Sequence, residues 1–162
     1  MKLPAAQLVN GNAAKVAADQ PVVIIYLTAE CPIANRYAPV IEKLHLKYRK
    51  QLTLIRSFPN EVSERKIIRE VSREYKQTSP FVLDPKLAFA RALGVKVSPE
   101  AVLLDRSRNV VYRGRIDGRN IEHGKETTNF RHDLAEAIDE LLAGRPISQP
   151  EVQAKGCYLP ID

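Results

Sequence analysis

The chain has 162 residues, of which 44% are hydrophobic and 27% are charged, and these values are typical of a single globular domain over residues 1–162. They exclude a largely disordered chain. Lys and Arg outnumber Asp and Glu by 25 to 19, and the formal net charge is +6. The basic residues lie mostly on expected helix exteriors and turns and match no nucleic-acid-binding motif, so we expect a solvated basic surface and no nucleic-acid partner.

The amino-terminal residues, Met1–Ala6, lack the apolar core of a secretory signal. The two cysteines are too few to indicate an oxidising or a reducing compartment. A bacterial extracytoplasmic location, with the signal absent from this chain, and a cytoplasmic location therefore both remain open. The longest apolar run, residues 22–27, is far shorter than the roughly 20 residues of a membrane-spanning helix, so we expect no membrane span.

The first predicted elements are a buried strand and a helix. Residues 22–27 read Val-Val-Ile-Ile-Tyr-Leu, which is typical of a strand buried on both faces of a sheet. Apolar residues then recur at helical spacing over residues 33–48, and Pro32 suits the first position of a helix. We therefore expect a helix that starts at Cys31. Pro39 removes one amide donor inside this pattern, which predicts a kink and not an end.

The rest of the chain alternates strand and helix patterns and then adds a hairpin and a last helix. The expected strands are 52–55, 81–83, 101–104 and 110–112, and the expected helix starts lie at 60–63, Asp84-Pro85 and Thr128-Asn129. The last helix should stop at Gly144. This order predicts an α/β fold in which helices flank both faces of a central mixed sheet. Residues 145–162 contain three prolines and should form an extended tail.

Cys31 is the residue best placed for chemistry, because it ends the turn between the first strand and the first helix. Unpaired amides and the helix dipole favour a negative charge at such a position. They lower the pKa of a cysteine from about 8.5 to roughly 3.5–7.5, and the thiolate is the nucleophilic form. We therefore interpret Cys31 as a reactive thiol. A small apolar residue packed at a helix start is the alternative.

Residues 20–145 resemble the thioredoxin-like superfamily, in particular its redoxin branch. The run from Val22 to Cys31 is similar to the strand and turn that carry the attacking cysteine in that family, and Pro39 stands where the family kinks its first helix. The resemblance implies a thioredoxin-like fold with a helix and a strand inserted at about residues 63–83. Cys-Pro early in the chain and Gly-Cys-Tyr near its end also resemble a group of bacterial redoxin-domain proteins.

The segment Val97-Ser98-Pro99 resembles the cis-proline loop of the same family. Proline adopts a cis peptide bond at low cost. In the family, the backbone of this loop lies beside the thiol and pairs with an extended substrate chain. The resemblance therefore implies that Pro32, Ser98 and Pro99 bind substrate.

The chain departs from thioredoxins at two positions. Where they have two cysteines separated by two residues, this chain has Cys31-Pro-Ile-Ala34, and their buried carboxylate is replaced by Ile25. A standard dithiol reductase is therefore not expected. Cys157 is the one other cysteine, and its neighbour Gly156 permits an unusual backbone approach. A bond between Cys157 and Cys31, a free thiol and an intermolecular partner all remain open.

The segment Thr28-Ala-Glu-Cys31 also resembles the core of the peroxiredoxin motif, in which the threonine hydroxyl helps to orient a peroxide. The arginine of that family aligns with Pro99, so Arg113 or Arg115 would have to replace it. Arg115 is in addition a candidate neighbour of the thiolate and of bound substrate. A peroxiredoxin-like antioxidant enzyme that reduces peroxides is therefore one interpretation of the chain.

The first interpretation is a thiol-based oxidoreductase in which Cys31 attacks in thiol–disulfide exchange and Cys157 or an outside thiol resolves the intermediate. Its partners would be protein or small-molecule thiols and disulfides. The peroxidase is the second, and a thioredoxin-like binding module without turnover is the third. The three histidines, at positions 45, 123 and 132, show no metal-ligand spacing, so we expect no metal and no cofactor. The oligomeric state is not determined by the sequence.

Overall fold

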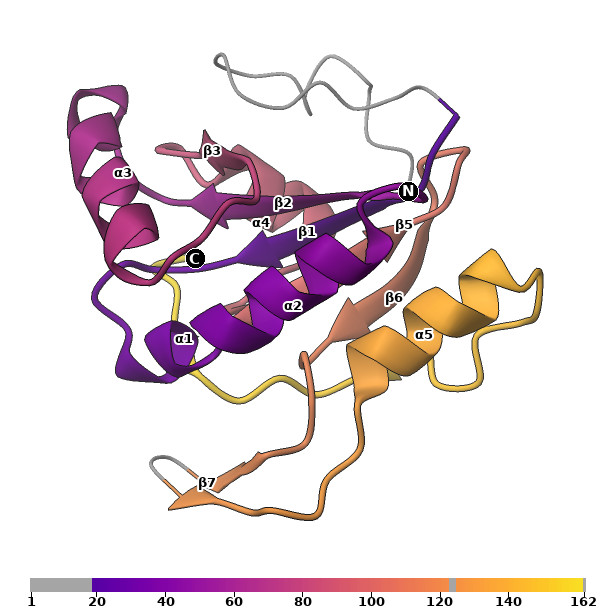
Figure 1. Ribbon diagram of the computed structural model, residues 1–162. Coiled ribbons are helices and arrows are strands. Elements are labelled where there is room, and N and C mark those ends of the chain that lie inside the picture. Colours follow the sequence, from indigo (N-terminus) through magenta and orange to yellow (C-terminus); the bar gives the residue numbers. More distant parts are fainter. Residues whose placement is uncertain (1–18, 123–124, 162) are drawn as a thin grey trace.

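A computed structural model describes residues 19–122 and 125–161 (Figure 1). Within these residues, the principal sheet has six strands in the order β3-β2-β1-β5-β6-β9. Its strands are β1 (Val22–Tyr26), β2 (Thr53–Phe58), β3 (Phe81–Leu83), β5 (Glu100–Leu104), β6 (Val110–Gly114) and β9 (Glu151–Val152). The central strand β1 pairs in parallel with β2 and antiparallel with β5, so the sheet is mixed, as predicted. The expected hairpin is confirmed, because β5 pairs antiparallel with β6.

The helices lie on both faces of this sheet. They are α1 (Pro32–Arg36), α2 (Ala38–Tyr48), α3 (Arg65–Glu74), which follows the 3₁₀ turn η2 (Val62–Glu64), α4 (Ala88–Leu93) and α5 (Asp133–Leu142). Alternate side chains of a strand point to opposite faces. Val23 and Ile25 of β1 accordingly share one core with residues of α2 and α5, whereas Ile24 and Tyr26 share a second core with residues of α4. The prediction of a strand buried on both faces is therefore confirmed.

The first helix differs from the expectation at its proline. One kinked helix was expected, but the structure has two helices, α1 and α2, which meet at Tyr37. Pro39 lies in the first turn of α2, where the lack of an amide hydrogen costs nothing because that amide has no partner inside the helix. The amide of Tyr37 donates to the carbonyl of Ala34 (3.0 Å) and closes α1. The prediction that Pro39 only kinks the helix was therefore wrong.

The last helix starts later than expected. α5 begins at Asp133 after His132, so the predicted caps Thr128 and Asn129 are not its caps. Two short strands, β7 (Asn120–Glu122) and β8 (Lys125–Glu126), pair antiparallel before α5. The residues that flank this pair are also hydrogen-bonded, since the amide of Thr127 donates to the carbonyl of Arg119 (2.7 Å). The expected stop is confirmed, since the helix ends two residues before Gly144.

The carboxyl-terminal tail folds back onto the sheet (Figure 1). β9 pairs in parallel with β6, where Gly114 lies opposite Val152. Gly114 has a φ of +151°, and a Cβ atom at this position would overlap the carbonyl oxygen of Val152, so the approach of the tail requires glycine. Farther along, β10 (Cys157–Tyr158) pairs antiparallel with β4 (Val97–Ser98). The tail is extended as predicted, and its two short strands are bonded to the body of the domain.

No helix in the described part of the chain combines the length and the apolar character needed to cross a bilayer. The expectations for Met1–Ala6 and His123 concern residues outside the described ranges.

Candidate active site

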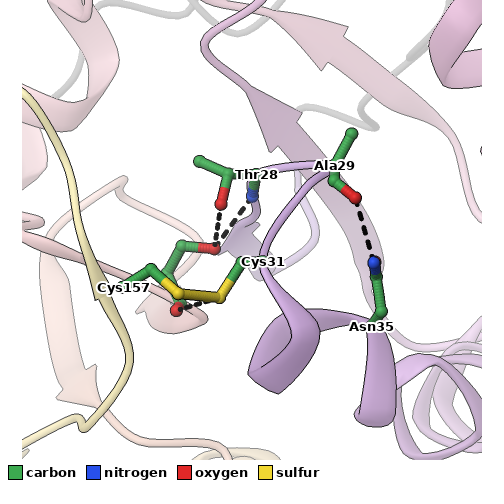
Figure 2. Close-up of a disulfide and its surroundings, with 6 residues drawn as sticks. Thr28, Ala29, Cys31, Asn35 and Cys157 are labelled. Carbon is green, nitrogen blue, oxygen red and sulfur yellow. Dashed lines mark hydrogen bonds between the residues drawn. A yellow bond between two sulfur atoms is a disulfide. The ribbon is translucent and has the colours of Figure 1, made fainter.

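Cys31 and Cys157 are joined by a disulfide bond (Figure 2). Their Cα atoms are 6.3 Å apart, although 126 positions separate the two residues in the sequence. The turn after β1 carries one sulfur, and the tail strand β10 carries the other. Of the states that the sequence left open for Cys157, the structure therefore has the intramolecular disulfide.

Cys31 occupies the N-cap position of α1, in agreement with the sequence pattern. Its amide donates to the carbonyl of Thr28 (3.1 Å), and its carbonyl accepts a hydrogen bond from the amide of Asn35 (3.0 Å). The side-chain amide of Asn35 donates to the carbonyl of Ala29 (2.9 Å) and so ties the turn to the helix (Figure 2). Pro32 takes the first helical position, as predicted. Sequence reasoning missed this contact, because an asparagine inside a helical pattern gives no signal of it.

Ser98 joins the Cys31 turn to β4. Its hydroxyl oxygen accepts a hydrogen bond from the backbone amide of Thr28 (2.8 Å) and lies 3.2 Å from the Thr28 hydroxyl. Its carbonyl oxygen lies 3.4 Å from Cys31 Sγ. The peptide bond between Ser98 and Pro99 is cis. These contacts and the disulfide bring Ser98 together with Thr28, Cys31 and Cys157 after the end of β1. Figure 2 labels the last three residues.

The bond between Ser98 and Thr28 should contribute measurably to stability. Replacing Ser98 by Ala leaves the partly buried Thr28 amide without its acceptor, and we expect a loss of about 1–3 kcal/mol in the free energy of unfolding. Thr28→Val is the matched control, since it removes a hydroxyl but keeps the amide bond, and its expected cost is about 1 kcal/mol. Urea unfolding of the oxidised proteins measures both. Equal costs for the two variants would show that the amide bond does not hold the turn.

Cys31 is only 3% exposed in this disulfide-bonded form, whereas Cys157 is half-buried. The sulfur of Cys31 therefore sits at the helix start, as expected, and beneath a tail strand. Because a disulfide sulfur carries no charge, a thiolate at Cys31 forms only after the bond opens. Access of a second molecule to that thiolate then requires the tail strand to move aside.

Arg115 and Arg113 each link separate elements. The Nε of Arg115 donates to the buried carboxylate of Asp133 at the start of α5 (2.6 Å), and Arg115 and Pro99 line the same small pocket. Arg113 donates to the carbonyl of Leu93 (3.1 Å) and pairs with a carboxylate of β9 (2.9 Å). Among the described residues, neither guanidinium bonds to Cys31. The role of Arg115 in binding substrate stays a prediction.

A buried network anchors the helix that follows Cys31. The hydroxyl of Tyr37 donates to Asp117 (2.9 Å) and accepts a hydrogen bond from the side-chain amide of Asn120 (3.2 Å). Arg119 pairs with the same carboxylate (2.9 Å) and lies over the Tyr37 ring. The pKa of Tyr37 is raised above its ordinary value, mainly by burial and secondly by the negative charge of Asp117, so the phenol stays neutral. Sequence reasoning missed this network, because Tyr37 lies 80 residues from Asp117 and 83 from Asn120.

Comparison with known proteins places the chain among redoxins. The Redoxin family model matches residues 1–128, a range that includes Cys31, Ser98 and Pro99 and ends before Cys157. An uncharacterized conserved protein from Geobacillus kaustophilus is 23% identical with a TM-score of 0.76, over 89% of this chain and 78% of that one. A hypothetical protein from Sinorhizobium meliloti 1021 is 23% identical with a TM-score of 0.74, over 90% and 81%.

A third solved structure, a thioredoxin-like protein in the oxidized form, is 17% identical with a TM-score of 0.62, over 86% of this chain and 94% of that one. A search of curated proteins found no match. The structural likenesses confirm the thioredoxin-like fold that the sequence pattern implied. Because the family model covers most of its length, the chain belongs to the Redoxin family.

Proposed function

We propose that this redoxin is a thiol–disulfide oxidoreductase in which Cys31 is the nucleophile and Cys157 is the resolving thiol. The observation that carries the proposal is the disulfide between these residues, one sulfur of which lies at the N-terminus of α1. Membership of the Redoxin family supports thiol chemistry at Cys31. The substrates are protein or small-molecule disulfides and thiols.

The reaction begins with both cysteines reduced. The Cys31 thiolate attacks one sulfur of a substrate disulfide, the substrate S–S bond breaks, and one substrate thiolate leaves. The Cys157 thiolate then attacks Sγ of Cys31, the second substrate thiolate leaves, and the Cys31–Cys157 disulfide forms. The substrate gains two electrons and the protein loses two. An external dithiol restores both protein thiols.

The surroundings of the two sulfurs favour attack by the external dithiol on Cys157 when the Cys31–Cys157 disulfide is reduced. Cys157 is the more exposed of the two, so an incoming thiolate attacks its sulfur. Cys31 is then the leaving group, and a leaving thiol of lower pKa departs faster. The start of α1 thus assists Cys31 both when it attacks substrate and when it is released.

Single-turnover exchange tests the proposal. Reduced full-length protein is mixed with oxidised glutathione or disulfide-bonded insulin, and thiol release and the Cys31–Cys157 bond are followed by mass spectrometry. We expect exchange much faster than with free cysteine at the same pH, and one protein disulfide for each substrate disulfide reduced. Exchange no faster than free cysteine contradicts the proposal. Slow exchange with rapid sulfenic acid formation by hydrogen peroxide would instead favour the peroxidase, with Thr28 orienting the peroxide.

The pKa of reduced Cys31 gives a second test. In the Cys157→Ser variant, where Cys31 is the single thiol, we expect the midpoint of alkylation by iodoacetamide within roughly 3.5–7.5, below the value of about 8.5 for a free thiol. A pKa lower in the folded than in the unfolded chain stabilises the fold above the unfolded value, and this stability is lost as the pH falls through the folded value. A midpoint at or above about 8.5 would leave Cys31 without activation by the helix.

A further inference from the structure

Residues 156–159 lie against β4, and β10 within them pairs with it as an added antiparallel strand. Cys157 is opposite Ser98, and Tyr158 is opposite Val97. The pairing continues past β10, because the amide of Leu159 donates to the carbonyl of Lys96 (2.9 Å). These are backbone contacts, which an extended segment of another polypeptide can make equally well.

The position before Cys157 accepts only glycine. A Cβ atom on Gly156 would overlap the carbonyl oxygen of Ser98 and lie 2.6 Å from its carbonyl carbon and 3.1 Å from the nitrogen of Pro99. All three are backbone atoms of Ser98 and Pro99, so they cannot rotate away from the added Cβ atom as a side chain could. A larger residue therefore pushes the strand off β4 and moves the Cys157 sulfur away from Cys31.

The two positions after the cysteine differ sharply in burial. Tyr158 is 86% exposed, whereas Leu159 is 6% exposed and belongs to the core shared by β1 and α4. The first position after the cysteine therefore places little restriction on its side chain, because that side chain lies in solvent. The second requires an apolar side chain, because a polar one would be buried among apolar residues.

Among the described residues, β10 is held by its backbone pairing with β4, by the disulfide, and by packing of Cys157, Leu159 and Ile161 against the two cores. Part of the segment between β9 and β10 faces the body of the domain across a cavity of about 330 Å³, whereas Lys155 lines a small pocket together with Pro99 and Arg115. Gln153 and Ala154 line the larger cavity on the side of the tail, and Lys96 and Arg113 line it on the side of the body. β10 pairs with β4 and β9 pairs with β6 in separate sheets, so release of β10 from β4 does not require β9 to separate from β6.

From these contacts we infer that the tail occupies the binding site of a polypeptide substrate and displays its preferred sequence. That substrate has a cysteine preceded by glycine and followed, two positions later, by an apolar residue, as in Gly-Cys-Tyr-Leu. This substrate class rests on the proposed function: β4 first holds the substrate cysteine against Cys31 and then holds Cys157 in its place. Substrate and tail exclude each other, and return of the tail both resolves the mixed disulfide and expels the product.

Peptides with the sequence of residues 154–161 test this inference. Each peptide carries a 2-thiopyridyl group on its cysteine, and attack by Cys31 of the full-length Cys157→Ser variant releases thiopyridone, which is read by absorbance. We expect changes equivalent to Gly156→Ala and Leu159→Asp to slow the reaction at least about tenfold each, and Tyr158→Ser to change it less than about twofold. Each rate is divided by the rate of the same peptide with glutathione. The protein's own tail competes equally with every peptide, so the ratios are unaffected.

The outcomes separate this inference from the proposed function. Fast reaction at equal normalised rates with all four peptides means that Cys31 is a nucleophile without this preference, which overturns the inference alone. Reaction no faster than with glutathione for every peptide overturns the proposed function. A second measurement uses the full-length reduced chain, where Gly156→Ala should slow closure of the Cys31–Cys157 disulfide and Tyr158→Ser should not. Equal closure rates for these two variants contradict the inference.

Discussion

The Cys31→Ser variant should reduce disulfide substrates no faster than the uncatalysed background. A serine hydroxyl is not ionised at neutral pH, so the variant has no nucleophile at the helix start. Cys157→Ser should behave differently, because it keeps the attacking thiol and lacks only the resolving one. We expect it to complete the first step and stop at a mixed disulfide between Cys31 and substrate.

A single turnover with limiting reduced protein distinguishes these variants by stoichiometry. The wild-type chain should release two substrate thiols for each protein molecule, Cys157→Ser one and Cys31→Ser none, and mass spectrometry should find substrate attached only to Cys157→Ser. Release of two thiols by Cys157→Ser would mean that an outside thiol resolves the intermediate. If the wild-type chain released none and Cys31→Ser still bound a partner, the chain would be a binding module without turnover.

Reduction of the disulfide should lower the free energy of unfolding by about 3–5 kcal/mol. The Cys31–Cys157 bond closes a loop of 126 residues, from the end of β1 to the tail. Such a cross-link restricts the unfolded chain, and the chain-entropy model gives about 5 kcal/mol for a loop of this length. The corresponding fall in Tm is roughly 6–20 °C for a chain of this size.

Guanidinium unfolding with and without dithiothreitol measures this effect. Cys157→Ser is the control, since it has no disulfide to lose and its stability should not respond to the reductant. Wild-type stability that is equal in both conditions would contradict the prediction. By linkage, the difference also measures how much more readily the folded chain forms the disulfide than the unfolded chain does. A strongly favoured folded disulfide makes the dithiol form a good reductant, in line with the direction of reaction proposed above.

Local patterns in the sequence determined the fold class and one half of the candidate site. The apolar run of β1 and the alternation of strands and helices predicted a mixed sheet covered on both faces, because periodicity and burial are properties of neighbouring residues. The same reasoning placed Cys31 at a helix start, where the structure has it. It failed at Pro39 and at the starts of α4 and α5: α4 begins at Ala88 after Leu87, not at Asp84-Pro85, because a proline or a polar pair fits more than one local structure.

Only the tertiary structure decided which groups meet Cys31. The Ser98–Thr28 bonds join positions 70 residues apart, and the disulfide joins positions 126 residues apart. Periodicity carries no information over such distances, because these contacts depend on strand register and on the path of the tail across β4. The sequence therefore placed Cys31 at a helix start. Its partner, the strand that pairs with β4 and the need for Gly156 were decided by packing between segments that are remote in the chain.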